Sequence, residues 1–430
     1  MSAQQRSDPR SQAARIPLVI YVFALSAFAL GFTEFVTIGL VSDIAADLKV
    51  DVGQVGAAVA AYAIGATIGA PILTALAASW SRKHLLLAAM IVFTIGNFLV
   101  GLSGSLPSLL AARFGSGLGH GVFLAVASSA ATRLVAPERA GSAVAVVFGG
   151  LTLALAFGVP IGTFLGGIWS WQTIFMGVAI CGAVGVAGLL LLMPNARDGG
   201  EAKDALHNLL ALIDRRLLSA AFITVLAYTG SFCLFSYISP LLIEATGMSA
   251  TWVSSMMLVY GVAAAIGNVV GGRMTDRLGP DRAVMIVLVG LAVVLAAMWP
   301  AVHSVPAMAV LIAALGALTY AAVPALQARV IGIAERQAPK ALAAAAGLNI
   351  AGFNSGIALG SLIGGSVIGA FGLTAIAIVG AGAAIAGIVV LTLQKGKAVD
   401  RVRRTIPCTS LLTSPRAGCA RAGRGNRRTH

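Results

Sequence analysis

Long apolar segments alternate with short polar ones along most of the chain. Each apolar segment has roughly 20 residues, which is enough for a helix to cross a hydrocarbon core of about 30 Å. None shows the apolar–polar alternation that strands of a membrane barrel would require. The pattern therefore predicts twelve membrane-spanning helices, at about residues 16–41, 52–77, 85–102, 107–132, 143–167, 171–192, 218–243, 251–274, 283–302, 307–331, 342–368 and 373–393.

The second half of the chain repeats the first. A shift of 198 residues lays Tyr62 on Tyr260, Gly69 on Gly267, and the glycine-rich segment 162–167 on 360–365. Parallel halves of this kind can place a substrate site near the middle of a bilayer and expose it alternately to either side. The sequence thus predicts an all-α membrane protein built as two six-helix bundles.

Composition and charge add an orientation. With 58% hydrophobic and 10% charged residues, the chain has too little polar surface for a water-soluble globule. Of its 29 Lys and Arg residues, all but Lys49 and Arg113 fall at or beside every second gap between spans, counting both chain ends. The positive-inside rule then predicts a multi-pass plasma-membrane protein with both termini cytoplasmic. The net charge of +14 reflects this topology and an anionic inner leaflet, and we expect no nucleic-acid partner.

Polar segments flank and separate the predicted bundles. The expected organisation is a cytoplasmic N-terminal segment at 1–15, the N-terminal bundle at 16–193, a cytoplasmic linker at 194–217, the C-terminal bundle at 218–394 and a basic tail at 395–430. An amphipathic helix on the inner leaflet is expected in the linker, because Leu206, Leu209, Leu210 and Ile213 recur on one helical face. The tail is rich in Arg, Gly and Thr without periodicity, so we expect it to be disordered and without function.

Two charged residues lie well inside an apolar span. They are Glu34 and Arg113, and counting 1.5 Å per residue places both about 10 Å from the outer ends of their helices. Each costs a few kcal/mol there unless it is paired, hydrated or neutralised. A carboxyl group whose partner or water access changes between two states can load and release a proton, which is one interpretation. The alternative is a static ion pair that holds the first bundle together.

Other polar residues are candidates for a substrate cavity. His120 follows Arg113 by seven residues and so returns to nearly the same helical face, where it could bind substrate, relay protons or simply pack. In the second half the candidates are Tyr228, Tyr237, Asn268, Gln327, Asn349 and Asn354. Interhelical hydrogen bonding is the competing explanation for most of them. No aromatic cluster clearly marks a sugar platform, and no membrane-embedded acid in the second half faces Glu34, so a single proton site is expected.

The segment Gly272-Arg-Met-Thr-Asp276-Arg277-Leu-Gly279-Pro-Asp-Arg282 resembles the gating-loop motif of the major facilitator superfamily. The resemblance implies an inter-helix charge network that holds one conformation and breaks in another. A simple topology determinant is the alternative. The equivalent loop of the first half keeps Arg82 and Lys83 but has Ala78 where the repeat would place the acid.

Further motifs resemble the arabinose and sugar efflux permeases of the drug:proton antiporter group. They are Gly31-Phe-Thr-Glu34-Phe35, Gly69-Ala-Pro71, Arg113 with Gly119-His120-Gly121, and Gly158-Val-Pro160-Ile-Gly162-Thr163. The last motif lies in a row of glycines that permits close helix contact, and Pro160 allows its helix to bend. The resemblance implies that this motif limits proton or solute leak. Helix packing alone is the other explanation for the glycine row.

The expected function is proton-driven export of a sugar or drug-like solute. A proton-independent facilitator or a nutrient symporter of the same fold is the alternative. We expect no enzyme, because one Glu, one Arg and one His on apolar helices show neither metal-ligand spacing nor a nucleophile with its base. No metal, cofactor or nucleotide is expected, since no GxxxxGK[ST] loop exists. The expected partners are a small-molecule substrate, protons and the lipid bilayer, with the protein acting as a monomer.

Overall fold

In a computed structural model, residues 16–77, 79–136, 139–195, 213–337 and 342–405 are described, and they form helices joined by short turns. Twelve helical segments in this part of the chain are long and apolar enough to span a membrane, which confirms the predicted all-α membrane fold. Exposed Leu, Ile, Val and Phe side chains cover the outer helical faces, as contact with lipid requires.

The N-terminal half contains six spans, and in some of them two or three helical elements follow one another end to end. The elements are α2 (Leu18–Gly39), α3 (Val41–Leu48), α4 (Val52–Ile68), η1 (Gly69–Leu73), α5 (Thr74–Leu76), α6 (Arg82–Gly101), α7 (Leu106–Arg133), α8 (Ala140–Leu153), η3 (Ala154–Gly158), α9 (Val159–Gly166) and α10 (Trp171–Leu192).

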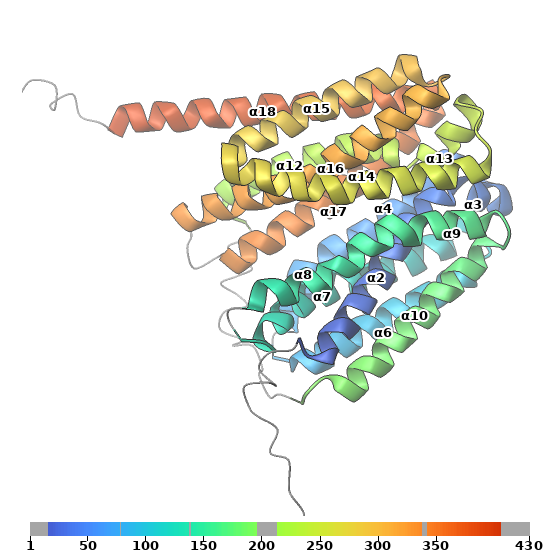
Figure 1. Ribbon diagram of the computed structural model, residues 1–430, viewed down its shortest axis with the longest axis horizontal. Coiled ribbons are helices and arrows are strands. Elements are labelled where there is room, and N and C mark those ends of the chain that lie inside the picture. The colour runs from blue at the N-terminus through green and yellow to red at the C-terminus, as the bar shows by residue number, and fades with distance from the viewer. Residues whose placement is uncertain (1–15, 78, 137–138, 196–212, 338–341, 406–430) are drawn as a thin grey trace, which may run out of the picture.

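The C-terminal half contains the other six spans. Its elements are α12 (Arg215–Phe235), α13 (Ile238–Pro240), η4 (Leu241–Ala245), α14 (Ala250–Leu278), α15 (Pro280–Ala301), α16 (Val305–Gln337), α17 (Leu342–Phe371) and α18 (Ala375–Thr405). The predicted disordered tail begins at residue 395, but α18 continues to Thr405 and projects past its neighbours (Figure 1). Lys397, Ala398 and three arginines favour a helix within 397–405, and the helix ends before Pro407, so the predicted boundary was too early. The N-terminal segment, residues 196–212 with the predicted amphipathic helix, and 406–430 lie outside the described residues.

Proline explains the three places where the helices widen to π geometry. Pro71 lies inside η1, Pro160 follows η3 by two residues, and Pro240 precedes η4. Because proline has no N–H group, it breaks the regular hydrogen-bond ladder, and a π segment is one way for the chain to absorb the break. Two of these segments, η1 and η3, interrupt long spans of the N-terminal half.

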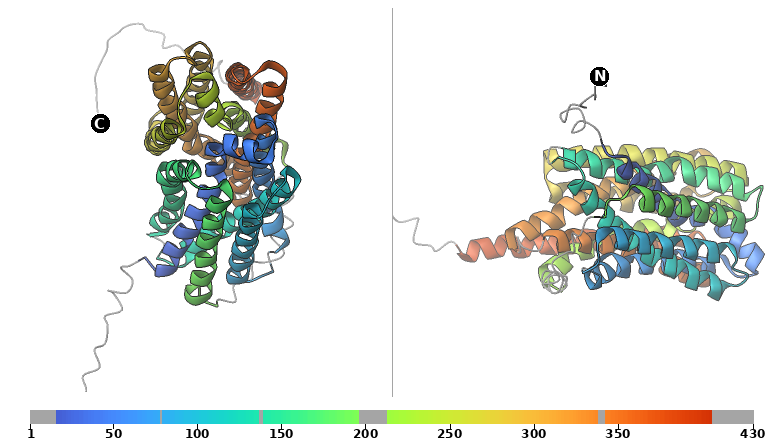
Figure 2. Two further views of the ribbon diagram at one scale, coloured as in Figure 1. Left: turned by 90° about the vertical axis from the view of Figure 1, so that its right-hand side faces the viewer. Right: turned by 90° about the horizontal axis from the view of Figure 1, so that it is seen from below.

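The two halves lie side by side, with α2–α10 in one and α12–α18 in the other (Figures 1 and 2). The main contacts between them are α4 along α17, and α14 against η3 and α9. We call the end of the bundles that carries Arg82, Arg133, Arg277 and Arg336 the basic end, and the end that carries the turns 49–51, 102–105, 246–249 and 372–374 the opposite end. Toward the basic end the helices of the two halves spread apart (Figure 1).

Glycines allow the halves to meet at the opposite end. A Cβ atom on Gly53 of α4 would lie 2.7 Å from the carbonyl oxygen of Gly365 in α17, so the two backbones touch. The hydroxyl group of Tyr237, the residue before α13, lies within hydrogen-bond distance of the carbonyl oxygens of Gly53 (3.2 Å) and Ser361 (2.6 Å) and can donate to either. Ser254 of α14 donates to the carbonyl group of Pro160 in α9 (2.7 Å). These contacts close the opposite end.

Candidate functional site

Arg113 joins three helices of the N-terminal half. Its side chain is fully buried in α7. Nη1 donates to the backbone oxygen (2.9 Å) and the hydroxyl group (3.1 Å) of Thr33 in α2, and Nε donates to the carbonyl group of Ala58 in α4 (3.3 Å). The guanidinium group also lies 4.2 Å from the centre of the Tyr62 ring, a cation–π contact. The Thr33 hydroxyl group in turn donates to Asn97 of α6 (2.5 Å).

Glu34 is buried on α2, with 7% of its surface exposed. Its Oε2 lies 4.0 Å from Nδ1 of His120, and that nitrogen shares a hydrogen bond of 2.7 Å with the hydroxyl group of Tyr62. Within the described part of the chain, the Glu34 carboxyl group accepts no hydrogen bond. Arg113 interacts with it electrostatically but forms no ion pair with it. The direct Glu34–Arg113 pair considered from the sequence is therefore not formed, because Thr33 takes the guanidinium group.

These contacts bring three predicted residues together with one that the sequence did not single out. We call Glu34, Tyr62, Arg113 and His120 the polar cluster. Tyr62 is 1% exposed and touches both Arg113 and His120. In the sequence it stands out only as the repeat partner of Tyr260, and its position on α4 between α2 and α7 could not be read from spacing within one helix.

The C-terminal half presents a cluster of stacked rings beside the polar cluster. It consists of Phe35, Tyr228, Phe232, Phe235, Tyr260, Tyr320 and Phe353, which we call the aromatic cluster. Phe35 is the only member from the N-terminal half. The sequence did not predict this cluster, because its rings are scattered over five helices and meet only in the folded protein; whether it forms a sugar platform stays a prediction.

Several ring pairs are close. Phe235 and Tyr260 stack with centroids 3.9 Å apart, and Tyr228 lies 4.7 Å from Phe353. Phe35, the residue after Glu34, packs 6.4 Å from Phe232 across the interface between the halves. The polar and aromatic clusters therefore face each other at one place, on the boundary between the halves.

The remaining cavity candidates lie elsewhere. Tyr237 forms the contact at the opposite end described above rather than lining the centre. Asn349 donates to Gln327 (2.6 Å) and accepts from Thr224 (2.6 Å), so both amides join helices, as the packing explanation expected. Asn354 is buried and donates to the carbonyl group of Ile350 in its own helix. Asn268 is exposed on α14 and is not brought to either cluster.

The gating-motif residues lie at the basic end. Gly279 has φ of +81° and ends α14, a backbone conformation that suits glycine. Asp276, Arg277 and Arg282 are exposed, and Gly272 is half-buried. Within this motif the acid that forms an ion pair is Asp281, whose Oδ1 lies 2.8 Å from Nε of Arg329 in α16. The predicted role for Asp276 in a charge network is thus not realised in this conformation.

The glycines of the predicted antiporter motif pack α9 and η3 against α2. A Cβ atom on Gly162 would lie 2.5 Å from Val36, and one on Gly158 would lie 3.2 Å from the Phe28 ring. Enlarging Gly162 would therefore force α9 and α2 apart. The carbonyl group of Pro160 is the acceptor of the bond from Ser254, so the motif contacts the other half directly.

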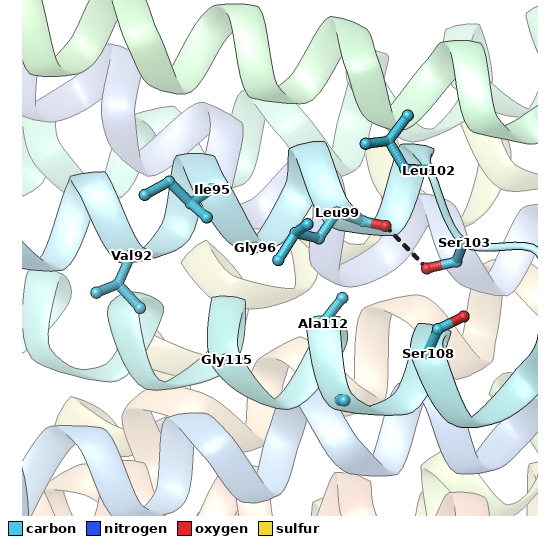
Figure 3. Close-up of a pocket in the computed structure, with 10 residues that line it drawn as sticks. Val92, Ile95, Gly96, Leu99, Leu102, Ser103, Ser108, Ala112 and Gly115 are labelled. Atoms are coloured by element: carbon cyan, nitrogen blue, oxygen red, sulfur yellow. Dashed lines mark hydrogen bonds between the residues drawn. The ribbon is translucent and has the colours of Figure 1, made fainter.

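A separate cavity of about 540 Å³ lies between α6 and α7 (Figure 3). Its walls are mainly apolar, with Val92, Ile95 and Leu99 on one side, and its polar Ser103 side chain donates to the Leu99 carbonyl group (2.8 Å). Ile95 and Leu99 are about half exposed, and neither cluster contributes a residue. This cavity opens toward lipid and is not the functional site. No group of side chains suited to a metal ion occurs in the described ranges.

Two similar six-helix halves, with buried polar and aromatic clusters meeting between them, define a membrane transporter rather than an enzyme. The sequence matches the Major Facilitator Superfamily over residues 23–219 and 220–407. The chain belongs to this superfamily and is a multi-pass protein of the bacterial inner membrane.

Individual proteins agree with this assignment. The MFS-type transporter YtbD of Bacillus subtilis is 40% identical over 379 residues, which cover 88% of this chain and 95% of that protein. The chloramphenicol resistance protein of Streptomyces lividans is 32% identical, with coverages of 82% and 90%. The crystal structure of the nucleoside transporter NupG has the same fold, with a TM-score of 0.68 at 15% identity over 87% of this chain and 98% of that one.

Proposed function

We propose that this protein exports a small solute, a sugar or a drug-like compound, by proton antiport with alternating access. The observation that carries the proposal is the Glu34 carboxyl group, which is buried at the boundary between the halves and accepts no hydrogen bond from the described residues. A carboxyl group in such a place is favoured in its neutral form while enclosed and in its charged form when water or a cation reaches it. That property allows it to carry one proton per cycle.

The positive-inside rule orients the cycle. It places the basic end in the cytoplasm, so the conformation closed by Tyr237 and Ser254 is an inward-facing one. In this state Glu34 releases its proton as solute binds, and in the outward-facing state it takes up another. The membrane potential contributes about 2.3 kcal/mol per charge per 100 mV to this exchange.

Competition between proton and solute follows from the position of the two clusters. Phe35 links them, because it adjoins Glu34 in sequence and packs on Phe232. A solute stacked on the aromatic cluster would therefore lie beside the Glu34 carboxyl group and change its access to water. Arg113 can stabilise the charged form of Glu34 after proton release. Its Nη2 has no hydrogen-bond partner among the described residues and remains available to the carboxylate.

The aromatic cluster also limits the class of solute. In this conformation its rings pack against one another, and we propose that the transport cycle opens their apolar faces to a flat or sugar-like molecule, with the phenols of Tyr228 and Tyr320 as polar edges. Among the described residues, Glu34 supplies the one carboxyl group at this site. A single carboxyl group does not make the site strongly acidic, so exclusively cationic solutes are not favoured. The similarity to a chloramphenicol resistance protein is in keeping with this class.

Everted membrane vesicles test the proposal. Proton movement is followed while arabinose, isopropyl thiogalactoside, chloramphenicol or a cationic dye is added, with wild type, Glu34→Gln and Glu244→Gln. Glu244 is the matched control, because it is exposed at the opposite end and undergoes the same chemical change. We expect one of the solutes to evoke proton efflux in wild type and Glu244→Gln, and none to do so in Glu34→Gln.

Two results would contradict antiport. Solute movement that continues in Glu34→Gln without a proton signal would make the protein a facilitator and Glu34 a structural residue. Proton movement in the same direction as the solute would make it a symporter.

A further inference from the structure

A buried amide lies beside the polar cluster. Asn97 of α6 is fully buried, and so is Thr33 of α2, which it contacts. An amide inside a membrane-spanning helix is costly unless protein groups satisfy its hydrogen bonds. Asn97 meets this requirement with Thr33 on one side and with the carbonyl group of Phe93, in its own helix, on the other. It thus connects α6 to the hydroxyl group that holds Arg113.

The direction of these hydrogen bonds is fixed by what each group can donate. Phe93 offers a carbonyl oxygen, which only accepts, so the NH2 group of Asn97 faces it (2.8 Å). The Oδ1 atom of Asn97 then faces Thr33, whose hydroxyl group donates its one hydrogen to it (2.5 Å). The lone pairs of that hydroxyl oxygen are left to accept from Nη1 of Arg113 (3.1 Å). Asn97 therefore orients Thr33 as an acceptor for the guanidinium group.

Arg113 has a stronger acceptor next to the one it uses. Thr33 holds Nη1 through its hydroxyl and backbone oxygens, while Nη2 has no partner among the described residues. Glu34 is the next residue of α2, and a carboxylate binds a guanidinium group more strongly than a hydroxyl group does, often with two parallel bonds. A group that favours Thr33 as the acceptor is needed to keep Arg113 there, and Asn97 provides it. Without Asn97, the hydroxyl hydrogen would be free to turn toward Arg113, and Thr33 would become a poorer acceptor.

The C-terminal half has neither the arginine nor the amide. Under the 198-residue shift an apolar residue replaces Arg113, and Asn97 falls on Leu295, which is fully buried. The hydroxyl group is kept, because Thr33 falls on Ser231. A buried amide therefore accompanies the buried arginine in one half, and leucine fills the same place where no cation has to be held.

We propose that Asn97 is a positioning residue that anchors Arg113 on Thr33, so that its contact with a charged Glu34 stays weak enough to break. The inference rests on the proposed function, in which Glu34 takes up a proton after each solute is released. A Glu34 carboxylate held by both Nη atoms of Arg113 would stay charged and would not take up that proton. Asn97 acts through Thr33 and touches neither the solute nor the proton.

Four variants separate positioning from packing. Asn97→Leu copies the residue of the other half and removes the acceptor of the Thr33 hydroxyl group. Thr33→Val removes that hydroxyl group at nearly unchanged shape, and Thr33→Ser keeps it. The matched control is Asn349→Leu, because Asn349 is also fully buried and accepts from a threonine, Thr224 (2.6 Å), in a network with Gln327 rather than with an arginine.

Crystal structures of the purified full chain test the positioning directly. We expect Nη1 of Arg113 to lie on Thr33 in wild type, Thr33→Ser and Asn349→Leu. In Asn97→Leu and Thr33→Val we expect a two-bond pair between Arg113 and Glu34. The proposal is wrong if Arg113 keeps its bond to the backbone oxygen of residue 33 and stays unpaired with Glu34 in both of these variants. This measurement needs no transport, so it decides the position of Arg113 whatever the solute or its coupling.

Transport in proteoliposomes tests the consequence, with radiolabelled chloramphenicol and arabinose as the probes. Net proton-driven flux needs Glu34 to be reprotonated in each cycle, whereas exchange of labelled for unlabelled solute does not. Net flux should therefore fall about tenfold in Asn97→Leu and Thr33→Val, the effect of one hydrogen bond to a charged group, while exchange changes less than about twofold. Asn349→Leu should change both rates by the same factor.

The two ways of failing are distinguishable. A proportional fall of net flux and exchange in Asn97→Leu would make the amide a packing residue and overturn the proposal. Solute flux without proton movement in wild type would overturn the proposed function instead, and the crystal structures would still decide whether Asn97 holds Arg113 on Thr33.

Discussion

The two halves of this protein share one scaffold and differ in chemistry. Tyr62 and Tyr260 are repeat partners, and each is buried on the second span of its half, α4 and α14. Tyr62 shares a hydrogen bond with His120 and lies under Arg113, whereas Tyr260 stacks 3.9 Å from Phe235. The same position thus supports an ionisable site in one half and an aromatic surface in the other.

The basic end repeats this contrast. The N-terminal half gathers Arg82, Lys83 and Arg133 around a cavity, and the C-terminal half has the Asp281–Arg329 pair at the equivalent junction. Duplication fixes where helices meet, because the contacts of small residues are repeated in both halves. It leaves the side chains at these meeting points free to diverge, and under the proposed function their divergence assigns proton chemistry to one half and solute contact to the other.

The largest difference between the halves should appear when each buried arginine is replaced by lysine. Arg113→Lys loses the fork that reaches both Thr33 and Ala58, since lysine is a point charge that cannot serve two helices at once. The loss of two hydrogen bonds to a charged donor costs about 3 kcal/mol, which corresponds to about a hundredfold fall in transport. Arg329→Lys keeps its pairing with Asp281 and should lower transport by about threefold at most.

Solute flux at matched expression, together with thermal unfolding of the purified variants, checks this comparison. If solute flux fell as much in Arg329→Lys as in Arg113→Lys, the two buried arginines would be equally important. That result would contradict a functional difference between the halves.

A smaller effect should separate the two repeat-related tyrosines. Tyr62→Phe removes the partner of His120 in a buried site, at a cost of about 1–3 kcal/mol, and should reduce proton-coupled flux about tenfold. Tyr260→Phe keeps the ring that stacks on Phe235 and should change flux less than about twofold. The reverse test is Tyr260→Leu, which removes the ring and should raise the KM for solute about fivefold without abolishing proton release. Equal effects of the two Phe variants would contradict the division between polar and aromatic halves.

The fold was predictable because each span carries its signal locally. Length, apolarity and the alternation of basic loops predicted twelve helices and two bundles, and all twelve spans are present. The buried position of Glu34 was also predictable, since a carboxylate in an apolar helix stands out wherever its neighbours lie, and its role in proton coupling stays a prediction. Helix ends were less predictable, as α18 shows by continuing to Thr405.

Contacts between distant helices could not be predicted from the sequence. Thr33 intercepts Arg113 because of how α2 and α7 cross, which no spacing within either helix encodes. The aromatic cluster draws rings from residues as far apart as Phe35 and Phe353. Asp276 matched the motif, but Asp281 forms the ion pair, because the turn at Gly279 places residue 281 beside α16. These features depend on tertiary geometry.

The smallest expected effect concerns the bond that joins the two halves. Ser254→Ala removes the hydrogen bond to Pro160, while Ser255→Ala removes a bond from Ser255 to Thr251 within the same helix. Both substitutions delete one hydroxyl group, but only the first weakens the closed opposite end. One neutral hydrogen bond contributes about 1 kcal/mol, so Ser254→Ala should shift the two conformations about fivefold toward opening at that end, and Ser255→Ala should not.

Distances between spin labels at Ser105 and Ser304 measure this shift. Both positions are exposed at the opposite end, one in each half, and the labels require a background without the free cysteines. A larger population of long distances in Ser254→Ala than in Ser255→Ala would show that the Pro160 carbonyl group, and hence the bent helix of the N-terminal half, helps to hold the closed state. Identical distance distributions would instead assign closure to the backbone contact of Gly53 with Gly365 and to Tyr237. In that case the proline motif would serve only to pack α9 against α2, and the asymmetry of the halves would be confined to the two clusters and the basic end.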